Sequence, residues 1–114
     1  MAQFLFLYRR PHEQPALSPA QMQQTIPKWQ AWFQELSANG HLKERGNPLE
    51  KEGKLVRGSK KNVTDGPYAE KDLVMGYTIV EAHDFDHACR LAEGCPGLST
   101  EMLVEVRPVL QITP

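Results

Sequence analysis

The chain is divided into segments whose hydrophobic spacing switches between the period of a β-strand and the period of an α-helix. Residues 4–8 form a continuous apolar and aromatic run, Phe-Leu-Phe-Leu-Tyr, which is typical of a strand covered on much of both faces. Pro11 limits its continuation, because proline cannot donate to a strand ladder. Each later change of spacing marks another element, and the order of these elements restricts the chain to few folds.

A long amphipathic helix is predicted after this strand. Ser18, Pro19 and Gln21 form a capping box with proline at the first helical position. Asn39 and Gly40 offer a left-handed stop. Pro27 removes a backbone donor, so we expect a kink there or a fresh helix start capped by Thr25. The apolar stripe consists of Met22, Ile26, Trp29, Phe33 and Leu36, with Trp32 on its shoulder; both tryptophans are expected to pack in the core rather than line a pocket.

The second half of the chain predicts strands on either side of a short helix. Residues 73–80 have the β-branched and aromatic content of a central strand. Asp84 is expected to cap a helix that Gly94 and Pro96 close. Residues 102–107 alternate as a half-covered strand. Between residues 43 and 64 the pattern is weak, and the alternation over residues 49–56 indicates a small hairpin.

The order of elements indicates an α+β fold. A strand counted within residues 49–63 gives βαββαβ, the ferredoxin-like arrangement of an antiparallel sheet with two helices on one face. No third helix remains to cover the other face of the sheet. We therefore expect a second copy of the chain to cover it, in a homodimer packed sheet to sheet.

Length, charge and cysteine content exclude several classes of protein. The 114 residues fit one domain over residues 1–114. A net charge of −1 gives no general attraction to nucleic acid or to a membrane surface, and no apolar run approaches the roughly 20 residues of a membrane span. Cys89 and Cys95 lack the spacing of a redox pair. We expect a cytoplasmic protein with reduced thiols that binds neither nucleic acid nor a membrane.

Five ordered motifs resemble the YCII-related family, in particular its DGPF-domain branch. They are Val63-Thr-Asp-Gly-Pro-Tyr-Ala-Glu70, Gly76-Tyr77, Glu81-Ala82, Gly94-Cys-Pro96 and Val104-Glu-Val-Arg-Pro-Val109. The resemblance covers nearly the whole chain and implies a ferredoxin-like fold that forms a dimeric α+β barrel. Most members have no assigned activity. The wider superfamily contains lyases and isomerases that act on ring or lactone substrates without a metal, so the resemblance implies no cofactor.

The sequence departs from the family pattern at three positions. Where family members carry a histidine on the first helix, paired with a nearby aspartate, this chain carries Trp29. The resemblance therefore does not transfer a His–Asp acid/base pair. Tyr68 replaces the usual phenylalanine of the DGPF motif, and Met75 stands where a second glycine commonly precedes Gly76. Neither of these two changes alters the expected fold.

Asp65 is the first candidate for chemistry. An aspartate on a turn at the mouth of a sheet-face cavity can act as a general base if burial raises its pKa. The alternative is that its carboxylate accepts the amides of its own turn, which lowers the pKa and removes the base. Tyr68 and Glu70 are expected to bind substrate at the same mouth, and the alternative for both is an exposed loop.

Three further residues are candidates around the ends of the strands. Arg9 follows the first strand and can hold a carboxylate with its planar guanidinium. His12 is a candidate acid/base group in place of the missing helix histidine, or a solvated side chain. For Arg107 we expect either contact with a ligand or an ion pair at a dimer interface.

Two clusters are assigned no binding role of their own. His83 and His87 have the spacing of zinc ligands, but His83 is expected to lie outside the helix that Asp84 caps, so no metal site is predicted. The cations Lys54, Arg57, Lys60 and Lys61 lack interleaved aromatic residues. We interpret them as a solvated loop or a guide for an anionic substrate, not as a nucleic-acid site.

Two functional hypotheses remain. In the first, the protein binds or transforms a small anionic organic molecule without metal or organic cofactor, in a lyase- or isomerase-like reaction if it is an enzyme. Asp65 is then the base, and Arg9 or Arg107 is the anchor. In the second, the protein is a non-catalytic ligand-binding or protein-interaction module, and the Asp65-Gly66-Pro67 turn only shapes the dimer.

Overall fold

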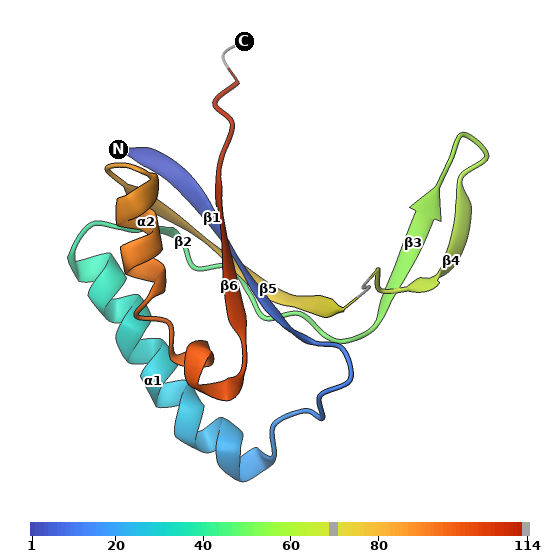
Figure 1. The fold of residues 1–114 in the computed structure, drawn as a ribbon, viewed down its shortest axis with the longest axis horizontal. Helices are drawn as coiled ribbons and strands as arrows, with labels where there is room; N and C mark the ends of the chain where they lie inside the picture. The colour runs from blue at the N-terminus through green and yellow to red at the C-terminus, as the bar shows by residue number, and fades with distance from the viewer. Residues whose placement is uncertain (69–70, 113–114) are drawn as a thin grey trace.

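The computed structural model describes residues 1–68 and 71–112. The fold is an antiparallel sheet with helices on one side and a hairpin that projects from it (Figure 1). In chain order the elements are β1 (Ala2–Pro11), α1 (Pro19–Ala38), β2 (Leu42–Glu44), β3 (Gly53–Arg57), β4 (Asn62–Gly66), β5 (Asp72–Ala82), α2 (Phe85–Ala92), the 3₁₀ helix η1 (Pro96–Thr100) and β6 (Leu103–Pro108).

The four-stranded sheet has the order β2-β5-β1-β6, and every neighbouring pair is antiparallel. Helices α1 and α2 lie on the same face of this sheet (Figure 1). Because the sheet strands and the two helices follow in the order βαββαβ, the expected ferredoxin-like α+β fold is confirmed.

The second strand of the sheet was expected in the wrong place. β2 is Leu42–Glu44, a three-residue strand paired with β5, which is too short to show a hydrophobic period. No strand within residues 49–63 joins the sheet. β3 and β4 pair only with each other, so the hairpin predicted over residues 49–56 spans residues 53–66 instead. We call residues 53–66 the arm.

The first helix is a single element. Ser18 and Gln21 form the predicted capping box, and the helix continues through Pro27 to Ala38. A fresh start capped by Thr25 is therefore wrong; the Thr25 hydroxyl instead donates to the carbonyl of Met22 at 3.1 Å.

The core lies between the helices and the sheet. Trp32, placed by its spacing on the shoulder of the stripe, is at the centre of the core: it is 6% exposed, and its ring stacks on Phe6. Met22 and Ile26 were expected in the apolar stripe, yet they are 49% and 47% exposed. The first turns of α1 extend past the residues that cover the sheet, so only the second half of the stripe is used.

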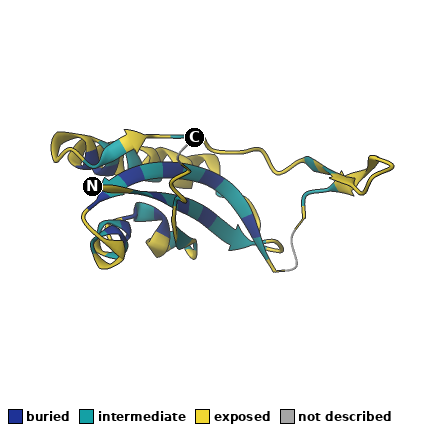
Figure 2. Cartoon of the chain, turned by 90° about the horizontal axis from the view of Figure 1, so that it is seen from above, coloured by how far each residue is buried: buried dark blue, intermediate teal, exposed yellow. Residues whose placement is uncertain are grey.

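Among the residues that the structure describes, nothing covers the second face of the sheet. Both helices lie on one side of the strands, and among the described residues no helix lies on the other side (Figure 1). Alternate residues of β1 and β5 are buried against the helices, and the residues between them are half-buried on the other face (Figure 2). We call this second surface the outer face. Within the described residues, no helix is long and apolar enough to cross a membrane.

Candidate functional site

The pairing of β1 with β6 places three charged side chains on the outer face. In this register Leu5 lies opposite Arg107, Leu7 opposite Glu105, and Arg9 opposite Leu103. Directly opposed residues of an antiparallel pair point to the same face. Phe4, Phe6 and Tyr8 alternate with these residues and are buried under the helices. Arg9, Glu105 and Arg107 therefore share the outer face with leucines; we call these three residues the charged strip.

Arg9 is fixed by two acceptors. Its Nε donates to Oε1 of Glu105 at 2.7 Å, and its Nη1 donates to the carbonyl of Asp72 at 3.3 Å. The side chains of Arg9 and Glu105 are 30% and 38% exposed, so the pair is partly shielded from water. Such a charge-assisted contact holds a guanidinium in one orientation. Arg107 lies two residues beyond Glu105 on the same face, which leaves the strip with one more cation than anion.

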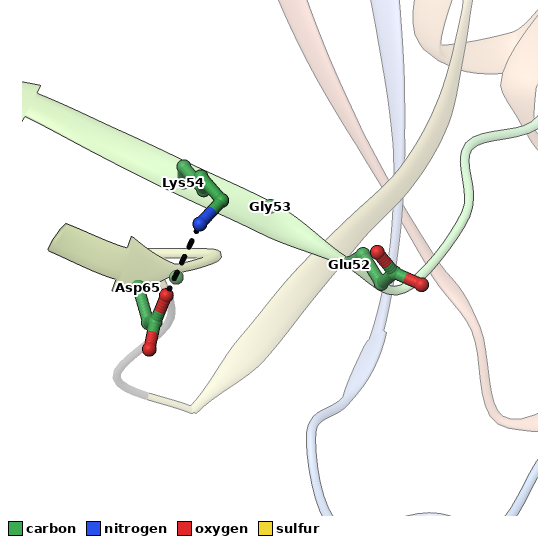
Figure 3. A pocket seen from close by; sticks show the side chains of 5 residues that line it. Glu52, Gly53, Lys54 and Asp65 are labelled. Atoms are coloured by element: carbon green, nitrogen blue, oxygen red, sulfur yellow. Dashed lines mark ion pairs between the residues drawn. The ribbon is translucent and has the colours of Figure 1, made fainter. Parts of the chain in front are cut away.

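Asp65 lies on β4 of the arm, away from the charged strip. Its side chain is 97% exposed and forms an ion pair of 3.5 Å with Lys54 on β3 (Figure 3). The two residues lie directly opposite each other in the hairpin. A shallow hollow of about 480 Å³ at the base of the arm is lined by Glu52, Gly53, Lys54, Asp65 and Gly66. Within one chain, this carboxylate is open to solvent.

Two other candidate residues, Tyr68 and His12, are exposed. Tyr68 is 63% exposed, and the Arg57 guanidinium lies 5.7 Å from the centre of its ring. His12 is exposed just beyond β1, and its backbone N–H donates to the carbonyl of Lys71 at 2.9 Å. Glu70 lies outside the described residues. One chain alone thus joins Arg9 to Glu105, and Asp65 to Lys54, but shows no contact between these two pairs.

The space between α1 and the sheet is filled by aromatic side chains. Trp29 meets Tyr8 edge to face at 5.0 Å, and Trp32 lies 5.8 Å from Trp29 and 5.3 Å from Phe33. Burial among these rings raises the pKa of Tyr8 well above its ordinary value, against the opposing effect of its hydrogen bond to Thr78. A phenol in this position stays protonated at neutral pH and cannot act as a base.

Two features of the helical layer did not emerge from the hydrophobic pattern. A groove of about 420 Å³ between α1 and α2 includes Trp32 and Leu36 together with the charged side chains of Lys28, Glu35 and Arg90. Its residues come from positions more than fifty apart in the chain, so no local motif reveals it. The second feature is a cluster of three histidines.

His41, His83 and His87 form this histidine cluster beside α2. The ring of His87 lies 4.9 Å from each of the other two rings. Nδ1 of His87 accepts the backbone N–H of His83 at 3.0 Å, and Asp84 caps the helix through the His87 amide at 2.7 Å. Desolvation, followed by Coulombic interactions with His41 and His83, lowers the pKa of His87 below its ordinary value. No group of three or more histidine, cysteine or acidic residues is arranged to hold a metal ion in the described part of the chain.

Comparison with known families identifies the chain. The model of the YCII-related domain family matches residues 1–113, nearly the full length of 114 residues. The chain belongs to the YCII-related family. No curated protein matches it in sequence.

Family membership defines what this YCII-related protein shares with its relatives and where it differs. At Trp29, the position where the resemblance places a catalytic histidine, the side chain packs against Tyr8 and Phe33. An indole offers no proton for acid/base exchange at neutral pH. The charged residues described above lie instead on the outer face, Arg9, Glu105 and Arg107, and on the arm, Lys54 and Asp65.

Proposed function

We propose that this YCII-related protein is a homodimer that binds a small anionic organic molecule on the outer face of its sheet. The observation that carries the proposal is the charged strip. Glu105 neutralises and orients Arg9, while Arg107 adds a second cation to the same face beside Leu5 and Leu7. A cation on a partly apolar surface suits a ligand with a carboxylate and a hydrocarbon body.

We assign the protein to the DGPF-domain branch of the family because of Asp65-Gly66-Pro67-Tyr68. If the dimer catalyses a reaction, we propose a cofactor-independent, lyase- or isomerase-like step in which Asp65 is the base and His12 a second proton carrier. Tyr68 and Glu70 then contact the substrate. Free cysteines support a cytoplasmic location, and neither nucleic acid nor a membrane is part of the proposal.

The second candidate function is a non-catalytic ligand-binding or protein-interaction module. Two observations favour it. Trp29 occupies the place of the helix histidine and is packed against aromatic rings. Asp65 is almost fully exposed within the chain and is paired with a lysine, so neither of the usual acid/base groups is prepared for proton transfer within a single protomer.

The binding proposal is tested with matched charged and neutral probes. Benzoate and phthalate at millimolar concentration should raise the melting temperature of the protein, while benzamide should not. Arg107→Gln should weaken carboxylate binding by about tenfold or more, since a charge-assisted contact is worth roughly 1.5–3 kcal/mol. Lys28→Gln, which removes a cation from the helical groove, should leave binding unchanged. Loss of binding in Lys28→Gln alone would place the anion in that groove and contradict the proposal.

The catalytic hypothesis has a separate test. Once a binding carboxylate is known, its proton spectrum is followed over time with wild-type protein and with Asp65→Asn, which keeps the shape of the side chain and removes the base. Conversion by the wild type that Asp65→Asn abolishes supports catalysis. Binding without conversion in either protein supports the non-catalytic module.

A further inference from the structure

The arm is a two-stranded ribbon that extends away from the rest of the molecule (Figures 1 and 2). Val56 and Val63 lie directly opposite each other in it, at 67% and 60% exposure. A two-stranded hairpin without a packed face is marginally stable in water at best. One face of the arm thus presents a β-branched pair that requires a surface to cover it.

The charge of the arm is the second observation. Residues 53–66 contain four cations, Lys54, Arg57, Lys60 and Lys61, against the single acid Asp65, a net charge of +3. Residues 53–66 contain no aromatic side chain of the kind that alternates with cations in a nucleic-acid site. No helix of the described residues could cross a membrane. The partner of the arm should therefore be a protein surface that combines apolar and acidic groups.

The outer face of this same chain has that combination. Leu5, Leu7 and Ile79 are half-buried on it. Three acids lie on the same face and outnumber the two cations of the charged strip, Arg9 and Arg107. Glu44 pairs with Ile79, Glu81 with Gln3, and Glu105 with Leu7. The arm of a chain does not cover its own outer face (Figure 2). A second copy supplies the missing surface for both, and a two-fold axis makes the exchange reciprocal.

We infer that each arm crosses to the partner subunit of the homodimer and lies over the outer face there, so that Asp65 meets the charged strip of the other chain. This inference rests on the homodimer of the proposed function and extends it, because the ligand site then combines residues of two chains. Asp65, which shares the face of Val56 and Val63 in the arm, comes from one protomer, and Arg9, Glu105 and Arg107 come from the other. This arrangement explains why Asp65 and the charged strip lie apart within one chain: each meets the corresponding group of the partner subunit.

Cross-linking between isotopically distinct chains tests the crossing. Unlabelled and fully ¹⁵N-labelled protein are mixed in urea, refolded together and treated with a carbodiimide, which joins amines to carboxylates without a spacer. Peptides that join Lys54, Lys60 or Lys61 to Glu44, Glu81 or Glu105 are then identified by mass spectrometry. We expect mixed-label pairs, in which the lysine and the acid come from different chains.

A matched pair of variants tests the apolar contact of the arm. Val56→Thr with Val63→Thr keeps β-branching and makes the exposed pair polar, so the dimer dissociation constant should rise at least tenfold. Met22→Gln changes an apolar side chain that is 49% exposed outside the arm, and dimerisation should stay as in the wild type. Circular dichroism of each variant establishes that the fold is retained, and light scattering over a dilution series gives the dissociation constant.

The outcomes separate the arm from the dimer. Mixed-label pairs between arm and outer face support the crossing. A dimer whose arm lysines link only to acids of their own chain overturns it and leaves the proposed sheet-to-sheet homodimer in place. A protein that scatters as the 12.9 kDa single chain at micromolar concentration overturns both.

Discussion

Tyr8 and Thr78 are joined by a buried hydrogen bond between β1 and β5: the Tyr8 hydroxyl donates to Oγ1 of Thr78 at 2.7 Å. Thr78 is fully buried, and its hydroxyl donates in turn to the carbonyl of Arg45 at 2.8 Å. Arg45 begins the segment that leads from β2 to the arm. The relay therefore ties the start of that segment to the centre of the sheet.

Removing the Thr78 hydroxyl, the middle group of this relay, should lower the free energy of unfolding more than removing the Tyr8 hydroxyl at its end. Thr78→Val leaves the buried Tyr8 hydroxyl and the partly buried Arg45 carbonyl without their partner, so the free energy of unfolding should fall by about 2–3 kcal/mol. Tyr8→Phe leaves the bond from Thr78 to Arg45 in place and should cost about 1 kcal/mol. Urea unfolding measures both, with Tyr77→Phe on the outer face as a control that should stay within about 0.5 kcal/mol. Equal losses for the first two variants would contradict a relay.

Two glycines with nearly the same φ angle provide a second prediction. Gly46 and Gly58 have φ values of +72° and +74°, where any L side chain costs about 1–2 kcal/mol. A Cβ at Gly58 meets nothing within 4 Å, whereas at Gly46 it collides with the backbone carbonyl of Tyr77. Gly58→Ala should therefore lower the free energy of unfolding by about 1 kcal/mol, and Gly46→Ala by at least about 3 kcal/mol. Thermal unfolding checks the difference, and similar losses would show that the segment after β2 adjusts freely.

Most of the fold could be predicted from local patterns, because each long element carries a complete hydrophobic period. The capping box of α1 and the Asp84 cap of α2 were found from a few adjacent residues, since capping depends on local geometry alone. β2 was missed because three residues hold no period. The strand counted within residues 49–63 exists as part of the arm, and only its pairing partner was wrong.

The candidate site could be predicted only in part, because its geometry depends on register between distant strands. Arg9 and Glu105 lie 96 positions apart, and a slip of one residue between β1 and β6 would place them on opposite faces. The strand alternation correctly separated Glu105 and Arg107 from Val104 and Val106. It could not show that Glu105 pairs with Arg9, or that the Asp65 turn lies on a projecting arm.

The histidine cluster predicts a loss of stability in mild acid. The folded pKa of His87 is below its ordinary value of 6.5, so between these two values the unfolded chain binds the additional proton. The free energy of unfolding should therefore fall as the pH is lowered from 7 to 5. The structural cause is that Nδ1 of His87 accepts the backbone N–H of His83. Once Nδ1 is protonated it becomes a donor, and this hydrogen bond is lost.

A variant that keeps the acceptor isolates the contribution of His87. The groups that act on it are His41, His83, Arg90 and Asp84, and all remain in His87→Asn, whose side-chain oxygen can accept the same N–H. Urea unfolding at pH 7, 6 and 5 should show a shallower dependence in His87→Asn than in the wild type. His12→Asn, at an exposed histidine, should follow the wild type. If His87→Asn and the wild type lose stability in parallel, the effect originates elsewhere.

The buried thiol of Cys95 predicts a loss of stability in alkali. Burial raises the pKa of its thiol from 9.0 to about 11, although hydrogen bonds with the backbone of Gly97 and Leu98 act to lower it. Above pH 9 the unfolded chain loses this proton first, so the free energy of unfolding should fall between pH 9 and 11, by up to about 2 kcal/mol. Cys95→Ala should be less stable than the wild type at pH 8 and should lose less on further alkalinisation. The half-buried Cys89 serves as the control, since Cys89→Ala should retain the wild-type slope.

Reaction with a thiol reagent at pH 8 gives an independent measurement of the burial of Cys95. In Cys89→Ala the remaining thiol, Cys95, should react only as fast as the fold opens. A rapid phase in that variant would show that Cys95 is accessible.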